Sequence, residues 1–161
     1  MIQVKQKYRS QKERKKTMKE LMNNLNQLLA DLNLLYRKLQ NYHWNVQGKE
    51  FFVLHGKLEE YYNGVNEEID QIAEQILMLE GQPLGRMKDY LEIGKIEEAS
   101  NEKVGAAVIL ENVLADFSYV KRLLISVKEK ADENKVYEVS AMADSMIAQY
   151  SKAVWMLEQS K

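Results

Sequence analysis

The sequence predicts an all-α fold, a four-helix bundle, and three observations lead to this prediction. Residues 21–39 place a leucine at every third or fourth position, the spacing of one helix face: Leu21, Leu25, Leu28, Leu32, Leu35 and Leu39. The chain has one proline, Pro83, and few stretches in which apolar and polar residues alternate as in strands. Its 161 residues divide into four long amphipathic segments, which fits one compact domain.

The first helix is expected over about residues 18–45. Thr17 and Glu20 have the spacing of a capping box, in which the threonine oxygen and the glutamate each satisfy a free amide at a helix start. Gly48 marks the end of this helix because glycine readily adopts the backbone conformation that stops one. The leucine face therefore belongs to a helix that begins just before it.

Three further segments complete the bundle. The second long helix is expected over about residues 51–79, where Gly81 and Pro83 close it. Residues 87–93 are too few for a bundle helix and predict a short helix in the link that follows. The third long helix begins after Ser100, and the fourth carries the apolar positions of residues 139–157. A link that is longest between the second and third helices predicts the order up-down-down-up.

Composition excludes several classes of protein. The chain has no cysteine, which excludes disulfides, thiolate metal sites and thiol catalysis. No apolar run approaches the ~20 residues that a membrane span needs, so we expect no membrane partner. The N-terminus is basic but lacks the apolar segment of a secretory signal. A cytoplasmic location is the expectation.

Charge is distributed very unevenly along the chain. Residues 1–20 hold Glu13 and Glu20 against eight basic residues and carry a net charge of +6, whereas the rest carries −7. We therefore divide the chain into a basic N-terminal arm over residues 1–19 and a bundle over residues 20–161. A helix in this arm would gather most of its basic side chains on one face. The basic residues are Lys5, Lys7, Arg9, Lys12, Arg14, Lys15, Lys16 and Lys19. Such an arm predicts non-specific DNA binding, and the alternative is a solvated tail that aids solubility.

The two histidines are the first candidates for chemistry. His43 lies in the last turn expected of the first helix, and His55 lies in the first turns of the second. In an antiparallel hairpin these positions are level, so both imidazoles can face one site. Glu59 follows His55 by one helical turn on the same face. Two imidazoles and a carboxylate suit iron(II), with zinc as the alternative metal.

A second pair of candidates lies farther along the same helix. Asp70 and Glu74 are one turn apart, and Asp70 faces within ~60° of His55. Fifteen residues of straight helix separate His55 from Asp70 by ~22 Å, however, so one metal ion cannot contact both. Asp70 and Glu74 are therefore either ordinary surface residues or ligands for a site in another subunit. An antiparallel two-fold pairing of second helices would create two shared sites.

A metal site inside a single bundle is not expected. Di-iron sites of that kind use a Glu-x-x-His motif on two helices. The residues three before His43 and His55 are Gln40 and Phe52, neither of which is a ligand. The candidate site is therefore one between subunits.

At these residues the chain resembles the Dps family of ferritin-like proteins, the DNA-binding proteins from starved cells. The resemblance is carried by residues 43–48 (HWNVQG), 51–55 (FFVLH) and 70–74 (DQIAE), and it extends over roughly residues 20–160. It implies a ferritin-like bundle that assembles into a hollow dodecamer of two-fold dimers. It also implies a ferroxidase that oxidises iron(II), preferably with hydrogen peroxide, and stores ferric mineral inside.

The resemblance assigns a role to each candidate. The iron ligands are His43, His55 and Glu59 of one subunit, with Asp70 and Glu74 of its neighbour. Trp44 is the nearby aromatic that would absorb stray oxidising equivalents, although packing at the turn explains it equally well. The competing interpretation is a structural, nucleoid-compacting DNA-binding protein whose metal site is weak, vestigial or loaded with zinc. Under either interpretation we expect a cytoplasmic, nucleoid-associated protein.

Overall fold

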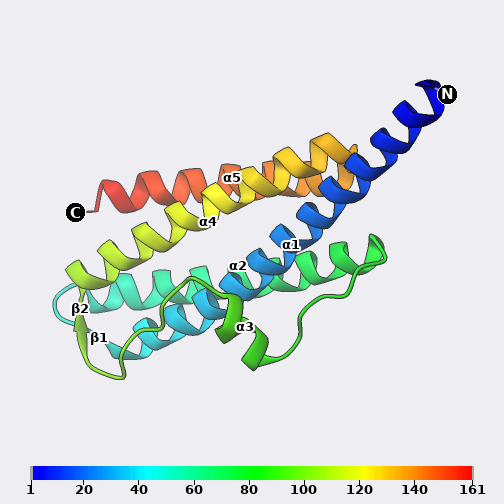
Figure 1. Ribbon diagram of the computed structural model, residues 1–161. Coiled ribbons are helices and arrows are strands. Elements are labelled where there is room, and N and C mark those ends of the chain that lie inside the picture. The colour runs from blue at the N-terminus through cyan, green and yellow to red at the C-terminus, as the bar shows by residue number, and fades with distance from the viewer. Residues whose placement is uncertain (1, 161) are drawn as a thin grey trace.

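The computed structural model describes the backbone of residues 2–160 and the side chains of residues 13–160. The bundle consists of α1 (Ile2–Asn45), α2 (Phe51–Met78), α4 (Ala106–Asn134) and α5 (Tyr137–Glu158). α1 and α5 run in one direction and α2 and α4 in the other, so the predicted up-down-down-up order is confirmed (Figure 1). The short α3 (Met87–Ile93) lies in the link between α2 and α4, as predicted.

The leucine face of α1 forms the centre of the core. Its six leucines are all at most 1% exposed, because α1 packs against both α2 and α4. α5 completes the bundle by packing mainly on α4. No helix in the described part of the chain is long and apolar enough to cross a membrane. The apolar periodicity of the sequence is thus satisfied by helix-on-helix burial.

The predicted start of the first helix is wrong, because α1 begins at Ile2 and passes through Thr17 without interruption. The Thr17 hydroxyl lies 3.2 Å from the Glu13 carbonyl oxygen and donates to Asn134 Oδ1 at 2.9 Å. A threonine inside a helix can turn its hydroxyl toward a carbonyl of the preceding turn, whereas a cap turns it toward a free amide. The two arrangements share the same residue types, which is why the motif was misleading.

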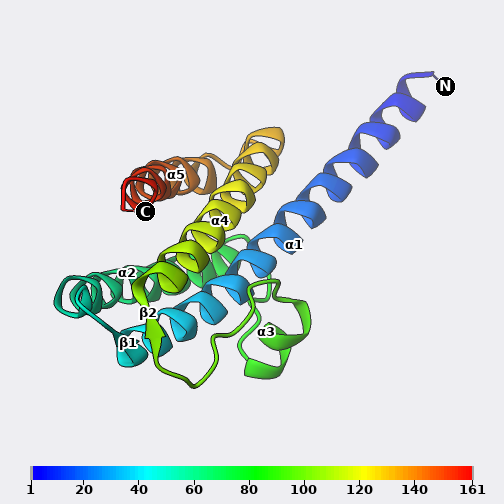
Figure 2. The ribbon, with the colours of Figure 1, turned by 90° about the vertical axis from the view of Figure 1, so that its left-hand side faces the viewer.

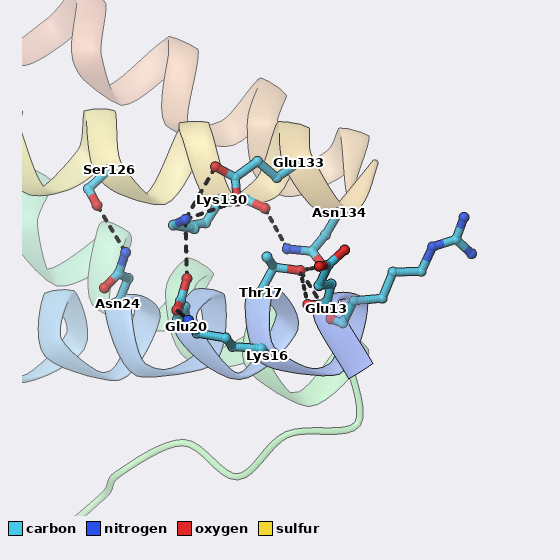
Figure 3. A network of polar contacts seen from close by, with 10 residues as sticks. Glu13, Lys16, Thr17, Glu20, Asn24, Ser126, Lys130, Glu133 and Asn134 are labelled. Carbon is cyan, nitrogen blue, oxygen red and sulfur yellow. Dashed lines mark hydrogen bonds and ion pairs between the residues drawn. The ribbon is translucent and has the colours of Figure 1, made fainter. Parts of the chain in front are cut away.

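Polar contacts fasten this part of α1 to the end of α4 (Figure 3). Besides Thr17–Asn134, the Glu20 carboxylate lies 3.1 Å from Lys130 Nζ, and Asn24 donates to Ser126 Oγ at 3.0 Å. We call these three pairs the N-terminal clamp. Beyond the clamp, α1 projects past the other helices in both views of the molecule (Figures 1 and 2).

The α1–α2 hairpin is closed by a tight turn and a short parallel sheet. Gly48 has φ +113°, a conformation in which a Cβ would be strained. Just before it, β1 (Val46–Gln47) pairs with β2 (Val104–Gly105), so that Val46 lies opposite Val104. This sheet ties the hairpin turn to the start of α4. It thereby fixes the end of the bundle at which both histidines lie.

One buried carboxylate of α1 binds the link that carries α3 through two backbone amides. Asp31 is fully buried, and its Oδ1 accepts hydrogen bonds from the backbone amides of Lys95 (2.6 Å) and Ile96 (3.0 Å). Its Oδ2 accepts from Gln27 Nε2 (2.8 Å) and from the Tyr119 hydroxyl (2.7 Å). Both oxygens are therefore fully used, which offsets the cost of burying the group.

Candidate metal centre

His43 and His55 face one another across the hairpin, and each is held by the backbone of the other. His43 Nδ1 lies 2.7 Å from the carbonyl oxygen of His55, and His55 Nδ1 lies 2.8 Å from the carbonyl oxygen of His43. The two rings are stacked, with centroids 3.7 Å apart and planes 20° apart. We call this arrangement the histidine clasp.

The clasp determines which ring nitrogens are available. A backbone carbonyl only accepts hydrogen bonds, so both Nδ1 atoms must carry the proton and donate it. In the neutral imidazole the lone pair then resides on Nε2. Metal-bound histidines are typically oriented in this way, by donation from the second ring nitrogen. The clasp thus presents two Nε2 lone pairs that can bind a metal ion, one from the end of α1 and one from the start of α2.

Two aromatic residues complete the surroundings of the clasp. Phe51 stacks on His55 with ring centroids 4.9 Å apart, and Tyr62 and His43 meet edge to face with ring centroids 5.4 Å apart. The Tyr62 hydroxyl also donates to Glu59 Oε1 at 3.5 Å, so this side chain contacts two of the expected ligands. Its role was missed in the sequence. The available signal was its helical spacing, seven residues after His55 and three after Glu59.

The expected carboxylate ligands are all exposed. Glu59 lies on α2 one turn after His55, and Asp70 and Glu74 lie one turn apart nearer its far end. Because α2 is an unbroken helix, Asp70 stays ~22 Å along the axis from His55. Asp70 lines a hollow of about 650 Å³ between α2 and the link that follows it.

The chain alone therefore brings together the two histidines and no more. Among the side chains of residues 13–160, no group of three or more histidine or carboxylate residues is placed to hold a metal ion. His43 is buried and His55 half-buried, whereas Asp70 and Glu74 remain at a distance on the same helix. The assignment of these residues as shared ligands remains a prediction.

Trp44 is directly beside the clasp but points away from the core. Its side chain is 54% exposed, and the guanidinium of Arg37 lies 5.9 Å from its ring centroid. Its backbone carbonyl accepts a hydrogen bond from Lys103 Nζ at 3.3 Å. The ring is thus accessible to solvent species near the histidines.

The basic arm is only partly visible at the level of side chains. Those of Lys5, Lys7, Arg9 and Lys12 lie outside the described residues. The remaining four, Arg14, Lys15, Lys16 and Lys19, are exposed on α1. Lys16 lies 4.0 Å from Glu20, a solvent-exposed pair of little energetic weight. DNA binding by the arm remains a prediction.

Comparison with known proteins agrees with this architecture. Residues 22–160 match the family described as Ferritin-like domain. The DNA protection during starvation protein of Brevibacillus brevis is 38% identical over 123 residues, 76% of this chain and 82% of the relative.

Solved structures agree equally well. The antigen TpF1 of Treponema pallidum superimposes with a TM-score of 0.88 and 33% identity, covering 90% of this chain and 93% of that one. A Dps protein of Vibrio cholerae O1, described as a ferritin-like diiron-carboxylate protein, gives a TM-score of 0.85 and 34% identity, covering 89% and 90%. With this fold, these relatives and a family match over nearly its whole length, the chain belongs to the Dps family of ferritin-like proteins.

Proposed function

We propose that this protein oxidises iron(II), preferably with hydrogen peroxide, at sites shared between two copies of the chain. The ferric product is stored as mineral inside a hollow dodecamer. The observation that carries the proposal is the histidine clasp, because it leaves two Nε2 lone pairs directed away from the backbone that holds their rings. Both Nε2 atoms are thereby free of the hydrogen bonds that hold the rings and are available to a metal ion.

The donor set suits iron as a substrate that changes oxidation state. Imidazole nitrogens of His43 and His55 bind iron(II) well, and the carboxylates of Glu59, Asp70 and Glu74 are hard ligands that favour the iron(III) product. Two iron(II) ions supply the two electrons that reduce one peroxide, and two protons complete the formation of two water molecules. The ligands therefore make oxidation more favourable without taking part in covalent chemistry.

The geometry of α2 supports the sharing of ligands between copies. Antiparallel two-fold pairing of two α2 helices brings Asp70 and Glu74 of each copy toward the clasp of the other. One interface then contains two equivalent sites. Trp44, exposed beside each clasp, would donate electrons to oxidising species that escape.

Protection of DNA is the second part of the proposal. Relatives of this chain carry the name DNA protection during starvation protein, and the net charge of +6 over residues 1–20 supplies phosphate contacts. Many arms on one particle would bind DNA by avidity, without reading its sequence. We accordingly propose a cytoplasmic, nucleoid-associated protein.

Removal of residues 1–12 is expected to weaken DNA binding while leaving the bundle intact. The truncated chain lacks Lys5, Lys7, Arg9 and Lys12 but keeps the N-terminal clamp. Retention of DNA in a gel-shift assay at low salt should fall by at least about tenfold, and the salt dependence of binding should become shallower.

A variant that loses the same number of charges from the bundle is the matched control. Gln replaces four exposed lysines of the body: Lys49, Lys88, Lys95 and Lys135. This variant should keep most of its DNA retention, because its arm is complete. Equal losses in the two proteins would mean that net charge, and not the arm, determines binding.

A structural, nucleoid-compacting protein with a weak, vestigial or zinc-loaded site is the second candidate. The charged arm favours it independently of the metal site, because DNA compaction needs no iron chemistry. Anaerobic titration with iron(II), followed by peroxide, distinguishes the two functions. Saturable binding and rapid oxidation support the ferroxidase, whereas oxidation no faster than that of free iron supports the structural role.

A further inference from the structure

The start of α1 leaves the bundle as a direct continuation of a core helix. Residues 2–16, which we call the projecting helix, precede the N-terminal clamp and extend past the other helices in both views (Figures 1 and 2). Fifteen residues of helix span ~22 Å. Among the described side chains of α1, that of Leu21 is the first to be buried. The projecting helix therefore lies outside the core.

The sequence explains how this segment stays helical without a core of its own. Residues 2–16 contain neither glycine nor proline and are rich in Gln, Lys and Arg, which are good helix formers. A free peptide of this length would be a marginal helix, because its first turn is costly to form. That cost does not arise here, since α1 continues outward from a segment that the clamp and the core already hold in helical form.

The projecting helix combines a large positive charge with the positive end of the α1 dipole. Seven basic residues and one acidic residue give residues 2–16 a net charge of +6. The first turn of α1 contains no acidic residue, so the partial positive charge of the helix start adds to that of the side chains. Both effects disfavour the helix on its own, and phosphate groups along it relieve both. A polyanion thus stabilises the helix that it binds.

The clamp gives this helix a fixed direction relative to the bundle. Thr17 donates a hydrogen bond to Asn134 Oδ1 at 2.9 Å. One turn later, Glu20 lies 3.1 Å from Lys130 Nζ, which is itself 2.9 Å from Glu133. Both attachments join α1 to the last turns of α4 (Figure 3). Two attachments one turn apart hold the direction of a helix as well as its position.

The dimensions of the projecting helix fit duplex DNA. A helix with its side chains is about 10–12 Å across, and the major groove is about 12 Å wide. Its length of ~22 Å corresponds to roughly six base pairs. Single strands are usually bound by stacking of bases on aromatic side chains, and residues 2–16 contain one aromatic residue, Tyr8. Shape and composition therefore both favour the duplex.

We propose that the projecting helix lies in the major groove of duplex DNA as one rigid element, aimed outward by the clamp, and that it prefers duplex to single-stranded DNA. This binding mode rests on the DNA-binding role proposed above. A disordered tail of equal charge would bind either form of DNA, since counterion release needs no fixed shape. Continuity of the helix is what separates a rigid element from such a tail.

A proline within the projecting helix removes its continuity without changing its charge. Proline lacks the amide hydrogen and clashes with the preceding turn, although a helix can begin at it. Gln11→Pro therefore separates residues 2–10, which are too few to remain helical alone, from the rest of α1. Gln11→Ala keeps the helix and is the matched control. Circular dichroism and size-exclusion chromatography verify that the bundle and its assembly are unchanged.

Each full-length, assembled protein is titrated at low salt into a labelled short duplex and into one of its strands, and fluorescence anisotropy is measured. Gln11→Pro should bind the duplex at least about fivefold more weakly than Gln11→Ala, while the two bind the single strand within about twofold. Gln11→Gly, a milder helix breaker, should fall between them.

Two results would overturn this binding mode: equal duplex affinity of Gln11→Pro and Gln11→Ala, or no duplex preference in the unaltered protein. Either result leaves the DNA-binding role intact as long as removal of residues 1–12 weakens binding. If that removal has no effect, the role of the arm itself fails.

Competition identifies the groove. Methyl green occupies the major groove of duplex DNA, and distamycin occupies the minor groove. Methyl green should displace the unaltered protein from the duplex, and distamycin should not. Displacement by distamycin alone would contradict a helix in the major groove.

The clamp is tested by a variant for which charge alone predicts the opposite result. Thr17→Ala combined with Glu20→Gln removes both attachments and raises the net charge by one, so charge alone would strengthen DNA binding. Loss of the fixed direction should instead lower duplex affinity by about twofold or more, the size expected for exposed contacts. Glu129→Gln, an exposed change on α4 with the same gain in charge, is the control. Duplex binding by the clamp variant that equals or exceeds that of the control would overturn the role of the clamp.

Discussion

Chains with His43→Asn and chains with Asp70→Asn are each expected to lose nearly all rapid iron oxidation, and to regain part of it when assembled together. Asparagine at position 43 keeps an N–H donor for the His55 carbonyl while removing Nε2, so the hairpin remains closed. Outer-shell partners of metal ligands already contribute about 10- to 100-fold, so loss of a ligand should cost at least that much.

The recovery follows from two-fold symmetry. In a mixed dimer, one site combines both altered residues and the other combines neither. Random pairing of equal amounts makes half of the dimers mixed, so about a quarter of all sites should be intact. Stopped-flow measurement of iron(III) formation on co-refolded chains, against each variant refolded alone, gives the result. An absence of recovery would mean that His43 and Asp70 do not serve one site from two chains.

Asp31→Ala is expected to lower the free energy of unfolding by about 3–5 kcal/mol, the largest stability effect of a single substitution that we anticipate. It removes both acceptor oxygens at once, leaving the buried amide of Ile96, the amide of Lys95 and the Tyr119 hydroxyl without their partner. Urea unfolding followed by circular dichroism measures the change.

Three further variants identify the origin of that loss. Asp31→Asn keeps one acceptor oxygen for the two backbone amides and should cost less than Asp31→Ala. Tyr119→Phe removes a single donor and should cost about 1–2 kcal/mol. Glu111→Ala, an exposed change on the same helix as Tyr119, should stay within about 0.5 kcal/mol. Equal effects of Asp31→Ala and Asp31→Asn would assign the stabilisation to charge instead of to the amide contacts.

Most of the bundle could be predicted because its helices bury one repeating face. The leucines of α1 recur at helical spacing, and every one of them is in the core. The end of α2 was predictable from Gly81 and Pro83, and the short α3 from its isolation between turn residues. These signals are local, so no knowledge of distant contacts was needed.

Features that depend on distant partners were not predictable. Asp31 interrupts the leucine face, and no neighbouring residue in the sequence indicates what it binds. The two amides that it binds are more than sixty residues away in the chain. Thr17 was misassigned for a related reason: its decisive partner, Asn134, belongs to another helix. A motif of three or four residues cannot distinguish a cap from an interior position whose hydroxyl is used elsewhere.

The candidate site was predictable in composition but only partly in arrangement. The spacing of His43 and His55 across a turn predicted that they lie at the same height along the two antiparallel helices. The clasp confirms this prediction. The exchange of hydrogen bonds with each other's backbone, and the contact of Tyr62 with His43 on another helix, depend on the three-dimensional fold. The contact of Tyr62 with Glu59 could have been inferred from their helical spacing. Asp70 and Glu74 lie too far along α2 to meet the histidines within one chain.

The continuity of α1 has a mechanical consequence. A single rod extends from Ile2 to the residues of the turn, so a force applied at its projecting end is transmitted along the axis instead of being absorbed by a loose joint. The first rigid support that it meets is the Thr17–Asn134 contact, and His43 lies roughly 39 Å farther along the rod. A load on the projecting end therefore reaches α4 through the clamp before it reaches the turn that holds the two imidazoles.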